Sequence, residues 1–243
     1  MYRMGLMAIM LILGAGRAAA DEATAADAGG LLGWRGTLDL GYLASSGNTE
    51  TQTLNFAAEA NRTFGQWTHN LYAQAVNSSD SGARSAERYL LGYKLDRALT
   101  EHSYVFGRVE TERDRFGGVL DRQHISAGYG RKLLTGPEHV LSIELGAGFN
   151  DLEFSDATTS SEMLISLVGD YSWAATSTTT LTQRLRYDAG EANDYAESES
   201  TVSVAISTRL ALSVSYLVKY NSTVPAGVET TDSYMAVGLS ISF

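Results

Sequence analysis

The ten residues LSIELGAGFN (141–150) alternate apolar with polar or small side chains without a break. Side chains of a β-strand point in turn to its two faces, so a strand of this sequence has one apolar face and one polar face. Leu145 falls on the apolar face and Glu144 on the polar face. A helix would scatter the same apolar residues around its axis, so a strand is predicted.

The same period of two recurs along the chain from Trp34 onward and predicts twelve strands. Most of them span ten to fifteen residues, whereas strands of soluble proteins usually have five or six. A tilted strand needs about nine to eleven residues to cross a bilayer. The predicted spans are 34–45, 49–63, 67–77, 87–97, 102–114, 121–133, 139–153, 162–173, 178–189, 196–208, 211–221 and 231–243.

The connections after odd-numbered strands are predicted to differ in length from those after even-numbered strands. Those after even-numbered strands are short, whereas those after odd-numbered strands are mostly longer and polar, for example 78–86 and 222–230. The connection at 46–48 is a tight exception. Short periplasmic turns and longer outer loops are typical of outer-membrane barrels, so both chain termini are expected in the periplasm.

The predicted fold is an all-β, antiparallel transmembrane β-barrel of twelve strands, and a soluble β-barrel or sandwich is the rival. The polar faces hold many charged side chains, which would be very costly singly in a dry core but acceptable in a wet lumen. Seven aromatic residues fall on the apolar faces near strand ends, as membrane interfaces favour. Three are predicted at the periplasmic rim and four at the outer rim: Trp34, Trp67 and Trp173, then Tyr42, Tyr89, Tyr187 and Tyr220.

The N-terminal residues predict export. Arg3 precedes an apolar run, 4–13, and Ala18-Ala19-Ala20 forms a cleavage site, so residues 1–20 are predicted to be a signal peptide. Residues 21–33 are interpreted as a flexible periplasmic lead-in and 34–243 as the barrel. The chain has 18 Lys and Arg and 28 Asp and Glu residues; without Arg3 and Arg17 the formal net charge is −12. Such an acidic chain is not expected to bind nucleic acid.

The inward positions of the strands are the candidate functional residues. Eight are predicted to line the lumen: Arg108, Glu110, Glu112, Arg122, His124, Glu144, Arg184 and Arg186. The wider set of inward charges has nine basic and six acidic members, a slight positive excess that favours anions inside the lumen. The acidic outer loops favour cations instead, so overall ion selectivity is predicted to be near neutral. The further members are Arg35, Asp39, Glu59, Arg88, Lys94, Lys132, Asp170 and Lys219.

Few residues suggest catalysis. His124 projects inward with Ser126 two residues on and Asp121 near, which raises the alternative of a Ser–His hydrolase. A Ser–His pair at this spacing is common by chance in a Ser-rich chain, so a hydrogen-bond network is the preferred interpretation and no catalytic residue is assigned. The chain has no Cys, and the spacing of its loop acids matches no known calcium loop. No metal or other cofactor is predicted.

Several motifs resemble the salt-induced outer-membrane protein family, which has a domain of unknown function. They are Gly41-Tyr42 with SGNTET (46–51), YVF (104–106) leading into DRF (114–116), Asp121-Arg122, GYG (128–130) and LGAGF (145–149). The terminal Phe243 resembles the aromatic signal that the barrel assembly machinery reads. The resemblance covers about residues 34–243, and it implies residence in the outer membrane and a link to osmotic or envelope stress. It implies no catalytic residue and no substrate.

Function is therefore expected to be that of a narrow passive pore or a structural protein of the stressed envelope, and not an enzyme. The alternative is an outer-membrane enzyme that acts on lipid or lipopolysaccharide; an adhesion barrel is disfavoured by short loops. The expected partners are outer-membrane lipid, lipopolysaccharide and the barrel assembly machinery.

Cleavage after Ala20 predicts that the exported protein begins at Asp21. Intact-mass measurement and N-terminal sequencing of protein from the membrane fraction check this. A membrane-bound chain that still holds residues 1–13 would contradict it.

Overall fold

The computed structural model describes residues 33–45 and 51–243. The predicted signal peptide, nearly all of the lead-in and the connection at 46–48 lie outside these residues. Trp34 immediately precedes the first strand.

The described chain forms a closed, all-β antiparallel barrel of twelve strands, which confirms the predicted fold class and strand number. Each strand pairs with its neighbours in sequence, and β1 closes the barrel against β12. The strands are β1 (Arg35–Ser45), β2 (Thr51–Phe64), β3 (Trp67–Asp80), β4 (Ala83–Ala98), β5 (Ser103–Asp114), β6 (Val119–Thr135), β7 (His139–Phe154), β8 (Thr159–Ala174), β9 (Thr179–Gly190), β10 (Tyr195–Ala205), β11 (Leu210–Asn221) and β12 (Thr231–Ser242).

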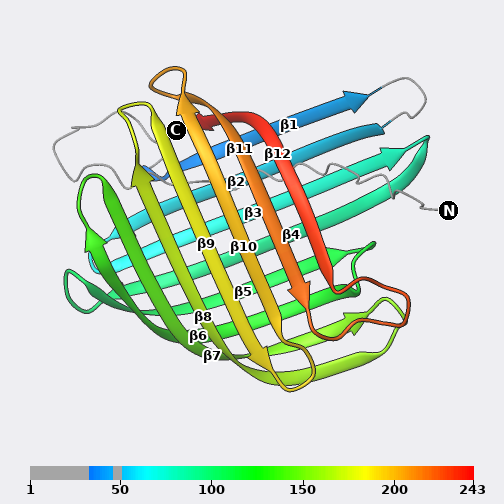
Figure 1. The fold of residues 1–243 in the computed structure, drawn as a ribbon. Helices are drawn as coiled ribbons and strands as arrows, with labels where there is room; N and C mark the ends of the chain where they lie inside the picture. The colour runs from blue at the N-terminus through cyan, green and yellow to red at the C-terminus, as the bar shows by residue number, and fades with distance from the viewer. Residues whose placement is uncertain (1–32, 46–50) are drawn as a thin grey trace.

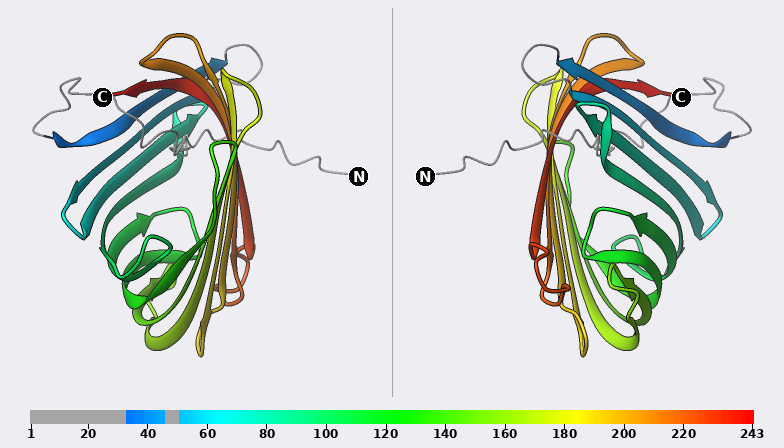
Figure 2. Two further views of the ribbon diagram at one scale, coloured as in Figure 1. Left: turned by 90° about the vertical axis from the view of Figure 1, so that its left-hand side faces the viewer. Right: turned by 90° about the vertical axis from the view of Figure 1, so that its right-hand side faces the viewer.

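The barrel wall has two broad sides that cross at a steep angle. Strands β9–β12 lie in front of β1–β5 in Figure 1, and β6–β8 join the two sides at the lower left. Figure 2 shows the same two sides from the flanks, where they meet along β6–β8. We call the end of the barrel with the start of β1 and the end of β12 the termini end, and the opposite end the loop end.

Side chains alternate between the two faces as the period of two predicts. In β7, Leu145 is 58% exposed on the outer face, whereas Glu144 is 2% exposed on the inner face. Outward apolar side chains of this kind occur on every strand, for example Leu40, Ile165 and Leu239. Among the described residues, no helix is both long and apolar enough to cross a membrane. The polar inner face and apolar outer face invert the arrangement of a soluble core.

The interior contains small apolar clusters where the two sides of the wall touch. Val76, Ala86 and Leu217 pack together with Tyr234, and thereby join β3 and β4 to β11 and β12. Ala57 of β2 and Ala236 of β12 form a second contact of this kind. The interior is therefore a packed region at these points rather than a uniformly wide channel.

The seam between β1 and β12 is short. Its register pairs four residues of each strand, from Thr37 with Ser242 to Leu40 with Leu239, whereas β1 and β2 pair over eleven. Phe243 extends the seam, because its backbone N–H donates to the Gly36 carbonyl and its carbonyl accepts from the Gly36 N–H, both at 3.0 Å. The C-terminal residue therefore takes part directly in closing the barrel.

The structure corrects the predicted connections. Strands β3 and β4 continue to a two-residue turn, Ser81-Gly82, where a nine-residue polar loop was expected at 78–86. Both turn residues have positive φ, 51° and 78°, as a tight hairpin turn requires. The β10–β11 connection is 206–209 rather than 209–210. Polar side chains do not end a strand whose backbone still pairs with a neighbouring strand. The difference in length between the connections at the two ends of the barrel is therefore smaller than predicted. Among the described connections at the loop end, only 222–230 is long.

Six of the seven predicted interface aromatics occupy the outer face. Trp67 and Trp173 lie at the termini end, and their side chains are 42% and 39% exposed. The four tyrosines lie toward the loop end on the outer face: Tyr42, Tyr89, Tyr187 and Tyr220. Trp34 is partly buried and precedes β1.

The alternation of faces predicts opposite environments at two neighbouring positions. Single cysteines at 144 and 145 should differ in labelling by a water-soluble thiol reagent in bilayers, because position 144 faces the interior and 145 faces outward. Leu145→Arg should destabilise the inserted barrel by about 2–4 kcal/mol, since a charged side chain would face hydrocarbon. Urea unfolding from lipid vesicles measures the change. Equal labelling of both sites would contradict the assigned faces.

Candidate functional site

The lumen, meaning the inside of the barrel, is lined by charged side chains. All eight residues predicted to line it lie on the inward face. Six of them are buried, with exposed fractions between 2% and 8%: Arg108, Glu112, Arg122, His124, Glu144 and Arg186. Glu110 and Arg184 are partly buried. Because these side chains are held away from bulk water, their partners inside the lumen determine what the site can do.

One carboxylate connects opposite walls of the barrel. Glu112 of β5 accepts from the Nε of Arg88 on β4, at 2.6 Å between Nε and Oε1, and it also forms an ion pair with Lys219. Lys219 lies on β11, six strands from β5 in either direction around the barrel. The Glu112–Lys219 pair therefore joins opposite walls of the barrel and narrows the lumen there.

A second bundle crosses the lumen between β5 and β9. The Nη1 of Arg186 lies 2.6 Å from Oε2 of Glu110, and its Nε lies 2.8 Å from Oδ2 of Asp188. Ser166 donates to the other oxygen of Asp188, at 2.6 Å between Oγ and Oδ1. Each carboxylate thus has both a cation and a neutral donor, because Tyr72 also donates its hydroxyl to Glu110.

A third bundle centres on Glu144. Its Oε2 lies 2.6 Å from Nη2 of Arg108, and Lys94 forms a further ion pair with it. Lys94 also pairs with Asp96 of its own strand, at 2.9 Å. Tyr104 donates its hydroxyl to Glu144 at 2.9 Å.

The two tyrosines reach their carboxylates across a glycine. In register, Tyr72 faces Gly92, which faces Glu110. A Cβ on Gly92 would lie 2.1 Å from the Tyr72 ring. Tyr104, Gly130 and Glu144 repeat the arrangement, with 2.3 Å at the glycine. Because glycine has no side chain, the tyrosine ring can lie across the middle strand at these points. The tyrosine hydroxyl then reaches the carboxylate on the strand beyond.

Sequence reasoning missed Tyr195, which it placed in a loop. Tyr195 begins β10, is 2% exposed, and has the Arg122 guanidinium 3.9 Å from its ring centroid. Arg186 and Lys219 lie within 6 Å of the same ring. Extending the period of two back from the inward Glu197 would have placed this aromatic ring among the cations.

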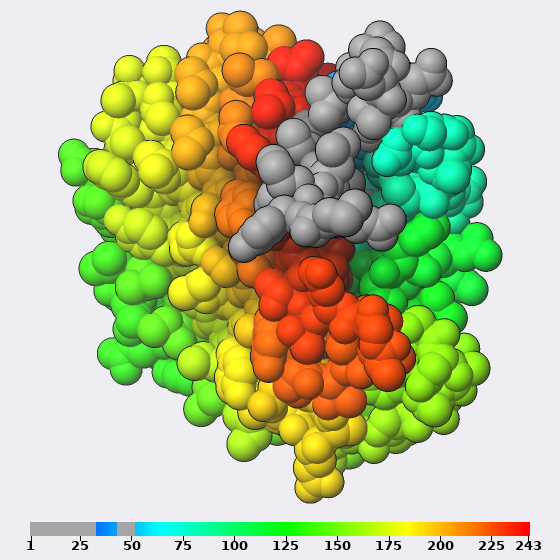
Figure 3. Space-filling view, turned by 45° about the vertical axis from the view of Figure 1, so that its right-hand side comes forward, coloured from blue at the N-terminus to red at the C-terminus, as the bar shows by residue number. Residues whose placement is uncertain are grey.

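Two connections are fixed to the wall at the loop end. Glu162 accepts from the backbone N–H groups of Ala192 and Asn193, at 2.7 and 3.0 Å. Asn193 in turn accepts from the Thr223 N–H, so residues 191–194 and 222–230 lie side by side, as Figure 3 shows near the end of the molecule. The two connections therefore lie together at the loop end of the barrel.

The structure corrects the predicted set of inward charges. Arg35 and Lys132 are exposed at strand ends, and a register irregularity follows Lys132. The prediction omitted seven carboxylates that the structure places on the inner face: Asp96, Asp114, Glu162, Asp188, Glu197, Glu199 and Asp232. The inner face is therefore acidic on balance, and the slight positive excess expected from the sequence is wrong.

His124 lies in a buried chain of hydrogen bonds. Its Nε2 and the Ser126 Oγ are 2.8 Å apart, and its Nδ1 lies 2.8 Å from the Asn150 Oδ1. The residue expected near them, Asp121, instead lies 4.0 Å from Arg113, and both are solvent-accessible. The register places His124 directly opposite Asn150, which a single-strand pattern does not predict. In the described part of the chain, no group of three or more His, Asp and Glu residues is arranged to hold a metal ion.

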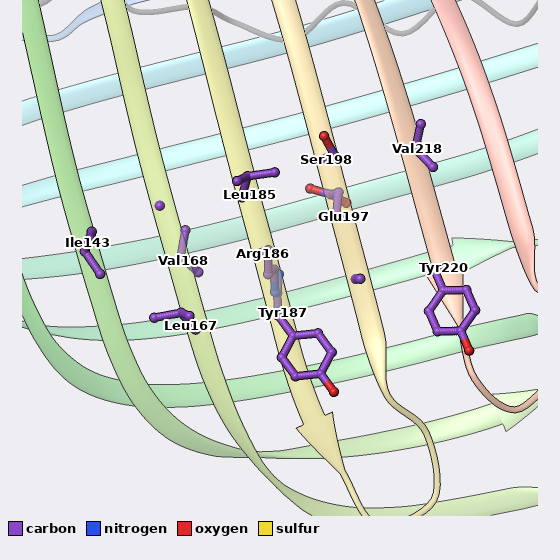
Figure 4. A pocket seen from close by; sticks show the side chains of 12 residues that line it. Ile143, Leu167, Val168, Leu185, Arg186, Tyr187, Glu197, Ser198, Val218 and Tyr220 are labelled. Carbon is purple, nitrogen blue, oxygen red and sulfur yellow. The ribbon is translucent and has the colours of Figure 1, made fainter.

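A depression of about 450 Å³ lies on the outer face rather than in the lumen. Figure 4 shows Leu185, Tyr187 and Tyr220 around it, together with Ile143 and Leu167. Its lining is almost wholly apolar, as expected of a surface that contacts lipid chains.

Comparison with known proteins identifies the family. The model of the family described as "Protein of unknown function, DUF481" matches residues 38–243. The chain belongs to the DUF481 family. The uncharacterized protein YdiY of Escherichia coli (strain K12) is 34% identical to this DUF481 chain over 212 residues, which are 86% of this chain and 83% of YdiY. The predicted domain of unknown function is thereby confirmed, whereas a link to salt stays a prediction.

A solved structure shares the fold of this DUF481 barrel. A NanC porin structure superposes with a TM-score of 0.51 at 12% identity, over 85% of this chain and 98% of the porin. A KdgM porin gives 0.48 at 10% identity, over 85% and 99%. At such identity the likeness to NanC concerns the fold alone.

The cross-lumen bundle makes Glu112 a sensitive position for stability. Glu112→Gln should lower the free energy of unfolding by about 3–5 kcal/mol, because Arg88 and Lys219 would be left buried without their carboxylate. Arg184→Gln is the matched control: its pair with Asp170 is over one-third exposed, so its loss should cost under about 1 kcal/mol. Urea titration of the refolded barrel measures both. Equal effects would contradict the difference in burial.

Proposed function

We propose that this protein is a narrow passive pore of the outer membrane. The observation that supports it is a closed barrel with apolar side chains outside and charged side chains inside. An apolar outer face is stable in a bilayer and unfavourable in water, and a closed sheet leaves no backbone edge in lipid. The porin-like fold agrees with this proposal.

Several interior atoms indicate that water enters the lumen. The buried Nε and Nη1 of Arg108, the Nε of Arg122 and both side-chain amide atoms of Asn55 have no hydrogen-bond partner among the described residues. Buried polar groups are almost always paired, by ordered water where protein offers no partner. We infer a hydrated path that the ion pairs narrow but do not make apolar.

We also propose the surroundings of the pore. Outer-membrane lipid and lipopolysaccharide would contact the apolar band, and the barrel assembly machinery would insert the chain and read Phe243. We place both termini in the periplasm. A narrow pore would let solutes equilibrate during osmotic stress without admitting large molecules, and we propose no catalytic role.

Planar-bilayer recording tests the pore. The purified chain should give small, steady ion currents, and Lys219→Ala should increase them because the contact between opposite walls is lost. Glu112 keeps its pair with Arg88 in this variant, so the barrel should remain folded. Leu212→Ala, on the outer face, is the control and should leave the current unchanged. A folded barrel that never conducts would reject the pore and favour a purely structural role.

A hydrolase acting on lipid or lipopolysaccharide is the second candidate, favoured by the Ser126–His124–Asn150 chain. In that reaction His124 Nε2 would take the proton from Ser126 as its Oγ attacks an ester carbonyl, and would give it to the departing alcohol. His124 would then take a proton from water as the water attacks the acyl-enzyme, and would return it to Ser126 as the acid leaves. Ser126 is only 3% exposed on the lumen wall, away from the lipid-contacting face. Esterase activity abolished by both His124→Ala and Ser126→Ala, but kept in Ser213→Ala, would favour the hydrolase over our proposal.

A further inference from the structure

Twelve of the inward carboxylates fall into two groups, according to whether they form an ion pair with Lys or Arg. Six form ion pairs with inward Lys or Arg: Asp96, Glu110, Glu112, Glu144, Asp170 and Asp188. Another six form no ion pair with Lys or Arg within the described residues: Asp39, Asp114, Glu162, Glu197, Glu199 and Asp232. Six inward cations are already paired with carboxylates, whereas Arg122 instead donates to Asn221 and lies over the Tyr195 ring. Carboxylates still outnumber the cations, so a surplus of carboxylates remains.

Four of the surplus carboxylates lie on one side of the lumen. Asp114 and Glu162 accept from backbone N–H groups of the loop-end connections and are accounted for there. The other four lie on β10, β12 and β1, and we call them the acidic lane: Asp39, Glu197, Glu199 and Asp232. Asp232 is near the loop end of β12, Glu197 and Glu199 follow along β10, and Asp39 is toward the termini end. The acidic lane thus extends over the depth of the barrel.

Two atoms of the acidic lane have no partner in the described protein. Asp39 is 1% exposed and its Oδ2 accepts no hydrogen bond; the Oε1 of Glu199 is likewise buried and unpartnered. Glu197 accepts from the Tyr195 hydroxyl, which is neutral. A buried carboxylate without a counter-charge is costly, so a mobile cation beside it lowers the free energy. The orphaned oxygens are the observation that points to an ion in the lumen rather than to surface solubility.

From this arrangement we infer that the lumen passes small inorganic cations in preference to anions, along the acidic lane. The inference rests on the proposed pore and names the class of solute it favours. Low-dielectric walls focus the field of charged side chains that line a pore, so the sign of the surplus charge decides which ion concentrates inside. Most inward cations that an anion would meet are already paired, whereas a cation would meet several carboxylates that form no ion pair.

The reversal potential in a gradient of potassium chloride tests the inference. The unmodified pore should give a permeability ratio of potassium to chloride above one. The isosteric variant Asp39→Asn/Glu199→Gln/Asp232→Asn should lower this ratio by about twofold or more. Its control, Asp80→Asn/Glu101→Gln/Asp151→Asn, removes the same charge from exposed positions and should change the ratio little.

A second measurement uses the unmodified chain and does not depend on the variant folding. Raising the salt from 0.1 to 1 M shortens the screening length from about 10 to about 3 Å, so cation preference should decline. Chloride preference, or equal shifts in the two triple variants, would overturn the inference while leaving the pore intact. No current from a folded barrel would instead reject the proposed function.

Discussion

Charged side chains turned into a closed barrel are separated from the surroundings by its wall, so whatever balances their charge must lie in the same lumen. This constraint organises the protein. Glu110, Glu112 and Glu144 each pair with a cation, and the pairs to Arg186 and Lys219 extend across the lumen. The two broad sides of the wall are consequently held close together. The interior therefore both stabilises the barrel and limits the width of any path through it.

The fold was largely predictable from the sequence because the period of two is a local signal. Alternation in 141–150 and eleven similar stretches indicated twelve strands and assigned Leu145 and Glu144 to opposite faces correctly. Strand ends were less predictable. Residues 78–86 are polar, yet β3 and β4 continue through them to Ser81-Gly82, since backbone pairing does not require apolar side chains.

The candidate site was predictable only in part. The alternation along a strand predicts which residues point inward, but the partner of each residue depends on strand register and barrel shape. No pattern within one strand indicates that Glu112 meets Lys219, or that Asn150 rather than Asp121 lies beside His124. The acidic balance of the lumen was missed partly for a simpler reason: seven inward carboxylates were left out of the inward set, and two of them, Glu197 and Glu199, had a parity that placed them there. A long-range contact cannot be inferred without geometry, whereas this omission could have been avoided.

The short seam at Phe243 has a consequence for how the chain is made. Its contacts join residues separated by almost the entire barrel sequence, so they cannot form until both β1 and β12 have been synthesised. The entropy lost in closing so long a loop grows only logarithmically, by about 0.6 kcal/mol for each doubling of length, so distance along the chain is not a large thermodynamic obstacle. The obstacle is one of timing: until the last residue arrives, β1 and β12 are two open edges that can pair with other chains. A nascent chain of this protein therefore has to be kept apart from its copies until its own ends meet.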